Sequence, residues 1–264
     1  MALSRAAGWN QAPEDWRHVL EAGRARGAVM EGRLVASAAL MPYGAFGWIC
    51  MVLVVPDVRR QGHATRLMDW ATRELEAAGR IAGLDATPEG REVYARLRFR
   101  DVAGLTRWAA PEGAHGETSP ASMRCRAMTD TDFEIVARED ARVFRADRRS
   151  VVAAFRERRP DLALVSCGAD AIEGYCFGRG GDLATHVGPV VAPSDVVGQA
   201  LIDAAVARTR GAVIIDLADR HVETAGRLAR AGFVARRSFT RMVRSDRPFG
   251  MDGAVFAVAG PEFG

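Results

Sequence analysis

A short basic turn holds the residues of this chain whose types and spacing are most specific for a chemical task. It contains two arginines, Arg59 and Arg60, and the small residues Gly62 and Ala64. An apolar stretch that predicts a strand precedes the turn, and an amphipathic stretch with a helical period follows it. Small side chains leave backbone N–H groups uncovered at the start of a helix, where the helix dipole is positive. Together with the two guanidinium groups, these donors predict a binding site for a diphosphate.

The elements that must position this turn follow from the pattern of apolar residues. Residues 48–55 predict the strand that enters the turn, residues 64–75 the helix that leaves it, and residues 81–85 a second strand. A strand that runs into a helix in this way directs the N–H groups of the first helical turn toward a ligand. The apolar face of the helix comprises Leu67, Met68, Ala71 and Leu75.

The turn resembles the pyrophosphate-binding loop of the GNAT N-acetyltransferases, which reads Gln or Arg, two variable residues, Gly, one variable residue, then Gly or Ala. Arg59, Gly62 and Ala64 occupy its three specified positions. A later segment is similar to the family motif Leu-Tyr-x-x-x-Gly-Phe. The positions in register there are Val93, Tyr94 and Phe99, and Arg98 stands at the glycine position.

The resemblance implies that acetyl-CoA is the co-substrate and that the loop contacts its diphosphate largely through backbone N–H groups. It further implies that the N–H of Val52 polarises the thioester carbonyl and that Val54 pairs with the pantetheine amides. An exposed turn residue is the alternative for His63. The loop residues assigned to CoA are Arg59, Arg60, Gln61, Gly62, His63, Ala64 and Thr65.

The family mechanism implies two further tasks, because a neutral amine attacks the thioester and CoA thiolate leaves. Tyr94 is the candidate acid that protonates the thiolate, since a phenol can supply a proton. No Asp or Glu occurs between Glu31 and Asp57, so the base is either a water chain or a carboxylate from elsewhere, of which Asp85 is the nearest candidate. A core position is the alternative for Tyr94, and capping of the next turn through Thr87 is the alternative for Asp85.

The two halves of the chain repeat one plan, which suggests an internal duplication. Gly62 and Gly198 are 136 residues apart, and Phe99 and Phe233 are 134 apart. A polar segment rich in Gly and Pro, residues 110–120, predicts a linker between a domain at 1–109 and another at 121–264. The other matching pairs are Pro56 with Pro193, Ala64 with Ala200 and Asp85 with Asp216.

The predicted fold class is α/β (α+β), with two tandem GNAT-like domains, each a mixed, mostly antiparallel twisted sheet flanked by helices. The family domain normally opens with a strand and a helix, but only eight residues precede Trp9. The first domain is therefore expected to lack that strand, or the chain to begin inside a longer product. The second half predicts strands at 123–127, 162–167, 171–178, 184–191, 212–217, 238–243 and 255–259, and helices at 130–144, 150–158, 195–208 and 222–231.

The second half keeps this plan but not the residues expected to bind CoA. Its turn at 193–198 has no arginine and carries Asp195, which repels a diphosphate, and Leu228 stands at the position of Tyr94. The chain thus resembles bacterial tandem GNAT proteins with a degenerate C-terminal domain, and that domain is expected to shape the acceptor pocket. A satisfied structural histidine is the alternative for His186. The candidate acceptor-side residues near strand ends are Tyr175, Arg179, His186 and Asp216.

Composition limits the remaining classes of function. No apolar run is long enough to span a membrane, the N-terminus has no signal-peptide core, and the four cysteines are too scattered for a zinc site. We therefore predict a cytoplasmic protein without a metal. The resemblance implies a small-molecule or peptide amine as the acceptor, and we expect a monomer or homodimer. The net charge of +3 and the absence of a basic block argue against nucleic acid as a partner. A non-catalytic acyl-CoA-binding or regulatory module is the alternative function.

Overall fold

The structure is a computed structural model that describes residues 1–111, 124–169, 171–245 and 251–264. The first half of the chain contains α1 (Ala2–Ala6), α2 (Pro13–Ala22), β1 (Arg24–Met30), β2 (Arg33–Tyr43), β3 (Phe46–Val54), α3 (His63–Ala77), β4 (Ile81–Ala86), α4 (Pro88–Arg96) and β5 (Arg100–Ala110). The second half contains β6 (Cys125–Ala127), α5 (Asp130–Phe144), α6 (Arg149–Arg158), β7 (Leu164–Cys167), β8 (Ile172–Gly180), β9 (Thr185–Val191), α7 (Asp195–Ala207), β10 (Val213–Ala218), α8 (Val222–Arg230), β11 (Val234–Arg244) and β12 (Val255–Ala257).

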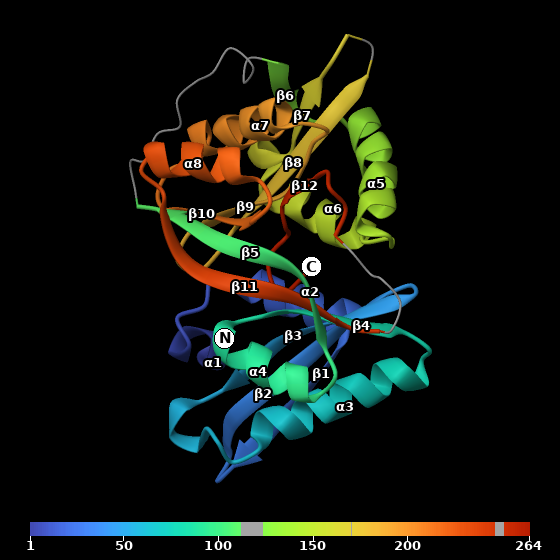
Figure 1. Cartoon of the computed structure of the whole chain (residues 1–264), viewed down its shortest axis with the longest axis vertical. Helices are drawn as coiled ribbons and strands as arrows, with labels where there is room; N and C mark the ends of the chain where they lie inside the picture. The colour runs from blue at the N-terminus through green and yellow to red at the C-terminus, as the bar shows by residue number, and fades with distance from the viewer. Residues whose placement is uncertain (112–123, 170, 246–250) are drawn as a thin grey trace.

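The described strands form one continuous sheet with helices packed along it (Figure 1). Its order is β1-β2-β3-β4-β11-β5-β10-β12-β9-β8-β7-β6. Among the described strands, only the β3–β4 and β9–β10 pairs are parallel. The predicted α/β (α+β) class, a mostly antiparallel sheet flanked by helices, is confirmed. No helix within the described residues is both long and apolar enough to cross a bilayer.

The two halves repeat the same order of elements. Each has three strands, a helix, a strand, a helix and a strand: β1 to β5 in the first half and β7 to β11 in the second. In both, the helix after the third strand packs its apolar face on the sheet. The predicted face of α3 is the buried one, with Leu67, Met68, Ala71 and Leu75 each at most 4% exposed. Burial of this face holds the start of α3 beside the end of β3.

Strands β5 and β11 join the two halves through an exchange (Figure 1). β11 comes from the second half, yet it lies between β4 and β5 and pairs antiparallel with both. β5 comes from the first half and pairs with β10 as well as with β11. Each half therefore completes the sheet of the other. The predicted linker lies mostly outside the described residues, and Ala110, its first residue, ends β5.

The parallel strands in each half separate soon after they meet. β3 and β4 pair only from Phe46–Ile81 to Trp48–Gly83, and then diverge. β9 and β10 pair only at Thr185–Val213 and His186–Ile214. Since no other strand of the described ranges enters between β3 and β4, a gap opens there toward the carboxyl ends of both strands.

The corresponding gap in the second half is filled by the chain itself. β12 pairs antiparallel with β10 at Ala257 and with β9 at Val255 and Ala257. Phe256 then packs beneath the start of α7, so closely that a Cβ on Gly198 would lie 2.7 Å from its ring. Within the described residues, β12 therefore closes the gap between the splayed strands of the second half.

Arg98 has a strained backbone that explains why the resembled motif has glycine at this position. It follows the end of α4 with φ +68°, and Gly232 has φ +88° at the matching position after α8. A side chain in this left-handed region costs about 1–2 kcal/mol. Glycine avoids that cost and adds about 0.5–1 kcal/mol of chain entropy to the unfolded state.

We expect Arg98→Gly to raise the free energy of unfolding by up to about 1 kcal/mol, measured by urea denaturation. Arg96→Gly is the matched control, because Arg96 is also exposed but lies within α4. It should lower stability by about 0.5–1 kcal/mol. Equal losses in both variants would show that the backbone at Arg98 stores no strain.

Candidate functional site

The turn after β3 presents a row of unused backbone donors. Arg60 and Gly62 have φ of +62° and +78°, and α3 begins at His63. The N–H groups of residues 60–65 make no backbone hydrogen bond within the described chain; the next one, from Arg66, donates to the Gly62 carbonyl. A row of such donors at the N-terminus of a helix of this length is suited to an oxyanion with several oxygens.

A cleft of about 870 Å³ runs along this turn, and we call it the donor cleft. β3 forms one wall, the start of α4 another, and Arg236, Arg237 and Ser238 of β11 a third. The second half of the chain thus contributes to a cleft whose loop belongs to the first. The sequence-predicted residues that line it are Val52, Val54, Arg59, Arg60, Gly62, His63, Ala64, Thr65 and Tyr94; Gln61 does not.

A bulge in β3 shapes the wall of the donor cleft. The register between β2 and β3 shifts near Met51, which has φ +52°, so that neither Met51 nor Val52 has a partner in the ladder. The Ser37 hydroxyl donates to the Met51 carbonyl at 2.9 Å and holds the bulge in place. A bulge re-aims the residues beside it, and Val52 consequently lines both the donor cleft and the cavity behind it.

A smaller cavity of about 70 Å³ adjoins the donor cleft in the gap between β3 and β4, and we call it the inner pocket. The two cavities share Trp9, Val52, Thr87, Tyr94 and Arg237, so they meet at these residues. The other residues of the inner pocket are Gln11, Ile49, Cys50, Met51, Leu84, Asp85, Arg107, Phe239, Pro261 and Glu262.

Tyr94 lies where the two cavities meet. Its ring packs near Phe99, with centroids 6.2 Å apart, and the side chain is half-buried. Burial raises the pKa of its phenol to about 12, so the group is protonated at neutral pH. Its hydroxyl makes no hydrogen bond within the described residues and is available to a ligand.

Asp85 also lines the inner pocket, but it is already paired. Both of its oxygens accept from the Arg241 guanidinium at 2.9 Å. Burial raises the pKa of the Asp85 carboxyl, and Arg241 opposes that rise. Capping of α4 belongs to Thr87, whose hydroxyl accepts from the Gly90 N–H at 3.3 Å.

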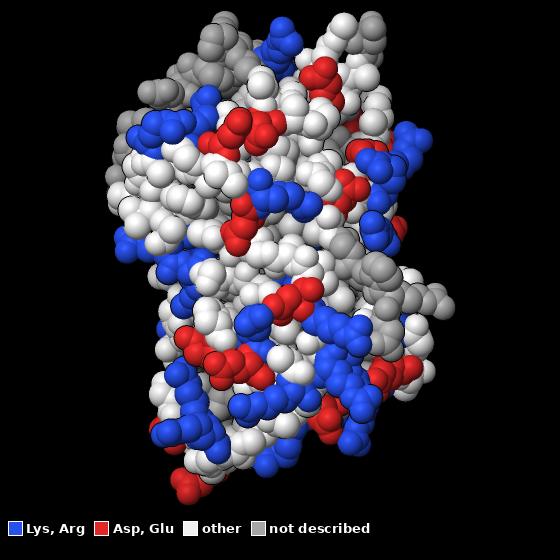
Figure 2. Space-filling view, in the orientation of Figure 1, with Lys and Arg blue, Asp and Glu red and all other residues white. Residues whose placement is uncertain are grey.

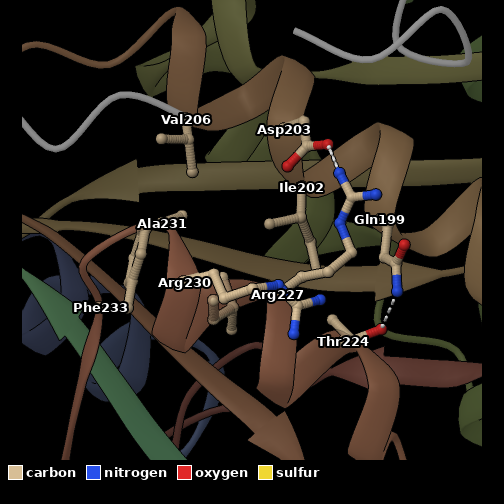
Figure 3. Close-up of a pocket in the computed structure, with 10 residues that line it drawn as sticks. Gln199, Ile202, Asp203, Val206, Thr224, Arg227, Arg230, Ala231 and Phe233 are labelled. Atoms are coloured by element: carbon tan, nitrogen blue, oxygen red, sulfur yellow. Dashed lines mark hydrogen bonds and ion pairs between the residues drawn. The ribbon is translucent and has the colours of Figure 1, made fainter. Parts of the chain in front are cut away.

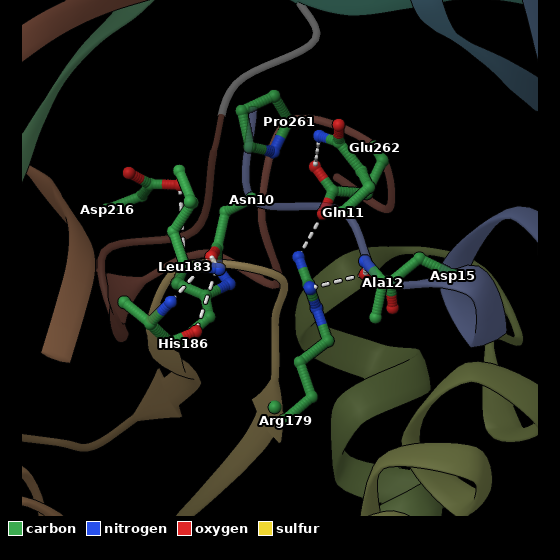
Figure 4. A network of polar contacts seen from close by, with 12 residues as sticks. Asn10, Gln11, Ala12, Asp15, Arg179, Leu183, His186, Asp216, Pro261 and Glu262 are labelled. Atoms are coloured by element: carbon green, nitrogen blue, oxygen red, sulfur yellow. Dashed lines mark hydrogen bonds and ion pairs between the residues drawn. The ribbon is translucent and has the colours of Figure 1, made fainter. Parts of the chain in front are cut away.

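The acceptor-side candidates lie behind the inner pocket rather than in it. Asp216 forms a bidentate ion pair with Arg107 at 2.7 Å for both contacts, and His186 Nε2 lies 3.3 Å from an Asp216 oxygen. Arg179 pairs with Asp15 at 2.8 Å and with Glu262 (Figure 4). Arg179 and Asp216 thus each contact a residue that lines the pocket.

Two further predicted site residues, Tyr175 and His63, are both buried. Tyr175 is buried in the core, where its hydroxyl donates to Asp140 at 2.8 Å, and it lines neither cavity. His63 is buried in the first turn of α3, and its Nδ1 lies 3.1 Å from Arg66. The alternative of an exposed turn residue for His63 is therefore wrong.

Sequence reasoning missed several residues of the inner pocket. Arg107 and Arg237 reach it only through the strand exchange, and Glu262 only because the tail after β12 returns to the first half. Trp9 and Gln11 precede α2 in an irregular segment. No local pattern marks any of these positions, since their neighbours in space are distant in sequence.

Another cavity, of about 130 Å³, lies between α7 and α8 (Figure 3). Four of its polar side chains pair with each other: Arg227 with Asp203 at 2.8 Å, and Gln199 with Thr224 at 3.3 Å. It contains none of the predicted site residues. The described residues hold no cluster of three or more potential metal ligands. On the face drawn in Figure 2, basic and acidic side chains are interspersed.

Comparisons with known proteins identify the family of both halves of the chain. Residues 4–99 match the sequence model described as "Acetyltransferase (GNAT) family", and residues 136–257 match that of an "Acetyltransferase (GNAT) domain". The uncharacterized N-acetyltransferase YitH of Bacillus subtilis is 23% identical over 244 residues, which cover 88% of this chain and 83% of that protein.

Two solved structures share the fold. A putative acetyltransferase from Pyrococcus horikoshii superposes with a TM-score of 0.71 at 20% identity, covering 95% of this chain and 83% of that one. A tandem GNAT protein from the clavulanic acid biosynthesis pathway superposes with a TM-score of 0.59 at 16% identity, covering 91% of each chain.

Proposed function

Because this chain belongs to the GNAT acetyltransferases and contains two GNAT domains in tandem, we propose that it is an N-acetyltransferase that moves an acetyl group from acetyl-CoA to a primary amine. The observation that carries the proposal is the row of free N–H groups at residues 60–65, opening on a cleft that also contains Tyr94. Diphosphate binding and proton donation are thereby combined in one cavity.

The donor cleft would bind CoA through charge and backbone donors together. The N–H groups of residues 60 and 62–65 would face the diphosphate, and Arg59 and Arg60 would add positive charge. Arg236, from β11, adds a further guanidinium to the same cleft. The irregular backbone at Val52 would offer its N–H to the thioester carbonyl, as the oxyanion needs, and Val54 would pair with the pantetheine amides.

The inner pocket would receive the amine. The attacking nitrogen forms a bond to the thioester carbon, the C–S bond breaks, and Tyr94 supplies a proton to the sulfur. Asp85 would take the proton from the amine, directly or through water. Its raised pKa makes the carboxylate a stronger base than an exposed one. Arg179 and Asp216, with His186 behind it, would position Glu262 and Arg107 on the acceptor side.

The direct test is amine-dependent release of CoA thiol from acetyl-CoA. A panel of primary amines, among them amino acids, aminoglycosides and peptides, should include members that accelerate thiol release and yield N-acetyl products by mass spectrometry. Binding of acetyl-CoA without transfer to any amine would instead favour the regulatory, non-catalytic alternative.

We expect one CoA site per chain, in the first half. Calorimetry with acetyl-CoA should give a stoichiometry of one, because β12 fills the matching gap in the second half. Arg60→Glu should weaken binding at least about 10-fold, since it puts a like charge beside the diphosphate.

Asp195→Arg is the matched control for the second half. It removes the repulsive charge at the start of α7 but leaves β12 in place. The stoichiometry should remain one. Two CoA sites per chain, in either the unaltered protein or the Asp195→Arg variant, would contradict the proposal that only the first half binds CoA.

A further inference from the structure

The charges that line the inner pocket do not all have partners. Asp85 pairs with Arg241, Arg107 with Asp216, and Glu262 with Arg179. Each of these pairs is buried or nearly so, and each sums to zero charge. Arg237 lines the same pocket and forms no hydrogen bond or ion pair within the described residues.

The position of Arg237 in the sheet brings its unpaired positive charge to the pocket. It lies opposite Arg107 in the β5–β11 ladder, so both side chains are on one face of the sheet. Like charges directly opposite one another are destabilising. Arg107 is neutralised by Asp216 behind it, whereas Arg237 is exposed toward the cavities. Glu89, in the first turn of α4, is in no ion pair within the described residues; hydrogen bonds from the backbone and from Thr87, and to a lesser extent the charge of Arg237, lower the pKa of its carboxyl.

A second unpartnered group lines the same pocket. Gln11 is 6% exposed, and its Oε1 atom is buried without a hydrogen-bond partner. Its Nε2 faces a Glu262 oxygen at 3.4 Å. Because a carboxylate can only accept, this contact fixes the amide so that Oε1 is the free atom. A buried free acceptor requires a donor, and an amine or amide N–H supplies one.

From these two groups we infer the class of acceptor: a small primary amine that also carries a carboxylate or a similar anionic group, as an amino acid does. Arg237 binds the anionic group, and Gln11 Oε1 accepts from the nitrogen. A cavity of about 70 Å³ has room for only a few atoms beyond the reacting nitrogen, which favours a compact molecule. This inference rests on the proposed function and specifies the substrate of the same site.

The competing role for Arg237 is contact with a phosphate of CoA, because the residue lines the donor cleft as well. The neighbouring Arg236 provides the comparison. A bulge between Ala235 and Arg237 turns Arg236 toward the donor cleft, and Arg236 does not line the inner pocket. Contact with CoA is therefore assigned to Arg236, and contact with the acceptor to its neighbour Arg237.

The experiment measures binding to the protein–CoA complex by calorimetry, so that it does not depend on turnover. The ligands are N-acetyl product pairs, such as N-acetylglycine with N-acetylglycinamide and N-acetyl-β-alanine with its amide. Neither member of a pair has an ionisable amine, so the pair differs only in the carboxylate. We expect each acid to bind about 10-fold or more tightly than its amide, the range for a hydrogen bond to a charged group.

The variants assign the preference to residues. Arg237→Gln should abolish the preference for the acid and leave the affinity for CoA unchanged. Arg236→Gln should weaken CoA and keep the preference. Gln11→Leu should weaken the acid and the amide alike.

The inference is wrong if no N-acetyl product binds, if acid and amide bind equally, or if Arg237→Gln weakens CoA while the preference persists. Failure of CoA itself to bind the unaltered protein would instead count against the proposed function. A complex that binds CoA but does not distinguish acid from amide counts against this inference alone.

Discussion

Replacing Tyr94 by phenylalanine should lower kcat by about 100-fold or more, within the range of general acid catalysis. The substitution removes only a hydroxyl that makes no hydrogen bond within the described protein, so packing against Phe99 should survive. The dissociation constant for acetyl-CoA should therefore stay nearly the same. Steady-state kinetics and calorimetry on the same preparation would separate the two effects.

The pH profile and a second tyrosine sharpen this test. Because the pKa of Tyr94 is raised to about 12, the acid form persists through neutral pH and is lost only as the pH approaches that value. Tyr175→Phe is the matched control, since that hydroxyl contacts Asp140 outside both cavities. It should reduce stability and leave kcat unchanged. A Tyr94→Phe enzyme with full turnover would place Tyr94 among the core residues.

Features that depend on neighbours in sequence were predictable. The period of apolar residues gave the buried face of α3, and helices α5 and α8 begin at the predicted residues 130 and 222. The basic turn was recognisable because its arginines, its small residues and the start of a helix all fall within seven consecutive residues. Tyr94 was found by its distance from Phe99, which one short helix determines.

Features that depend on strand order were not predictable from such patterns. Nothing in the sequence of β11 indicates that it inserts between β4 and β5, since its alternation of polar and apolar residues would suit any strand of an antiparallel sheet. The same holds for β12, whose short apolar run specifies burial but not a place between β9 and β10. The inner pocket depends on these long-range contacts, so Arg107, Arg237 and Glu262 were missed, whereas Val52, Asp85 and Tyr94 were found from local patterns.

The strand exchange also changes what a truncation can test. Two independent domains at 1–109 and 121–264 would predict that a fragment ending near residue 118 still binds CoA and loses only acceptor-dependent transfer. In the structure that fragment lacks β11, which bonds to β4 on one side and to β5 on the other. Both strands would expose an unpaired edge, so single substitutions separate the roles of the halves better than truncation does.

The largest expected effect on stability is at Arg179, which joins three parts of the chain. Its guanidinium contacts Asp15 of α2 and Glu262 of the tail, and all three side chains are at most 3% exposed. Arg179→Met would leave two buried carboxylates without this partner. Breaking a buried pair in this way costs about 3–5 kcal/mol, and urea denaturation should show a loss of that size.

Two controls distinguish charge from packing. Arg5→Met removes an ion pair with Asp182 that is largely exposed, and it should change stability little. Adding Glu262→Gln to Arg179→Met neutralises one stranded carboxylate and should restore part of the loss. A single Arg179→Met variant as stable as Arg5→Met would show that the network contributes no stability.

Activity in the Arg179→Met variant should reveal what the network does for the site. Glu262 and Pro261 line the inner pocket, whereas the loop at residues 60–65 is held by α3 and β3. Loosening the tail should therefore raise KM for the amine while the affinity for acetyl-CoA changes little. An equal loss of both affinities, measured at a temperature where the variant is folded, would mean that Arg179 supports the whole sheet rather than the acceptor side.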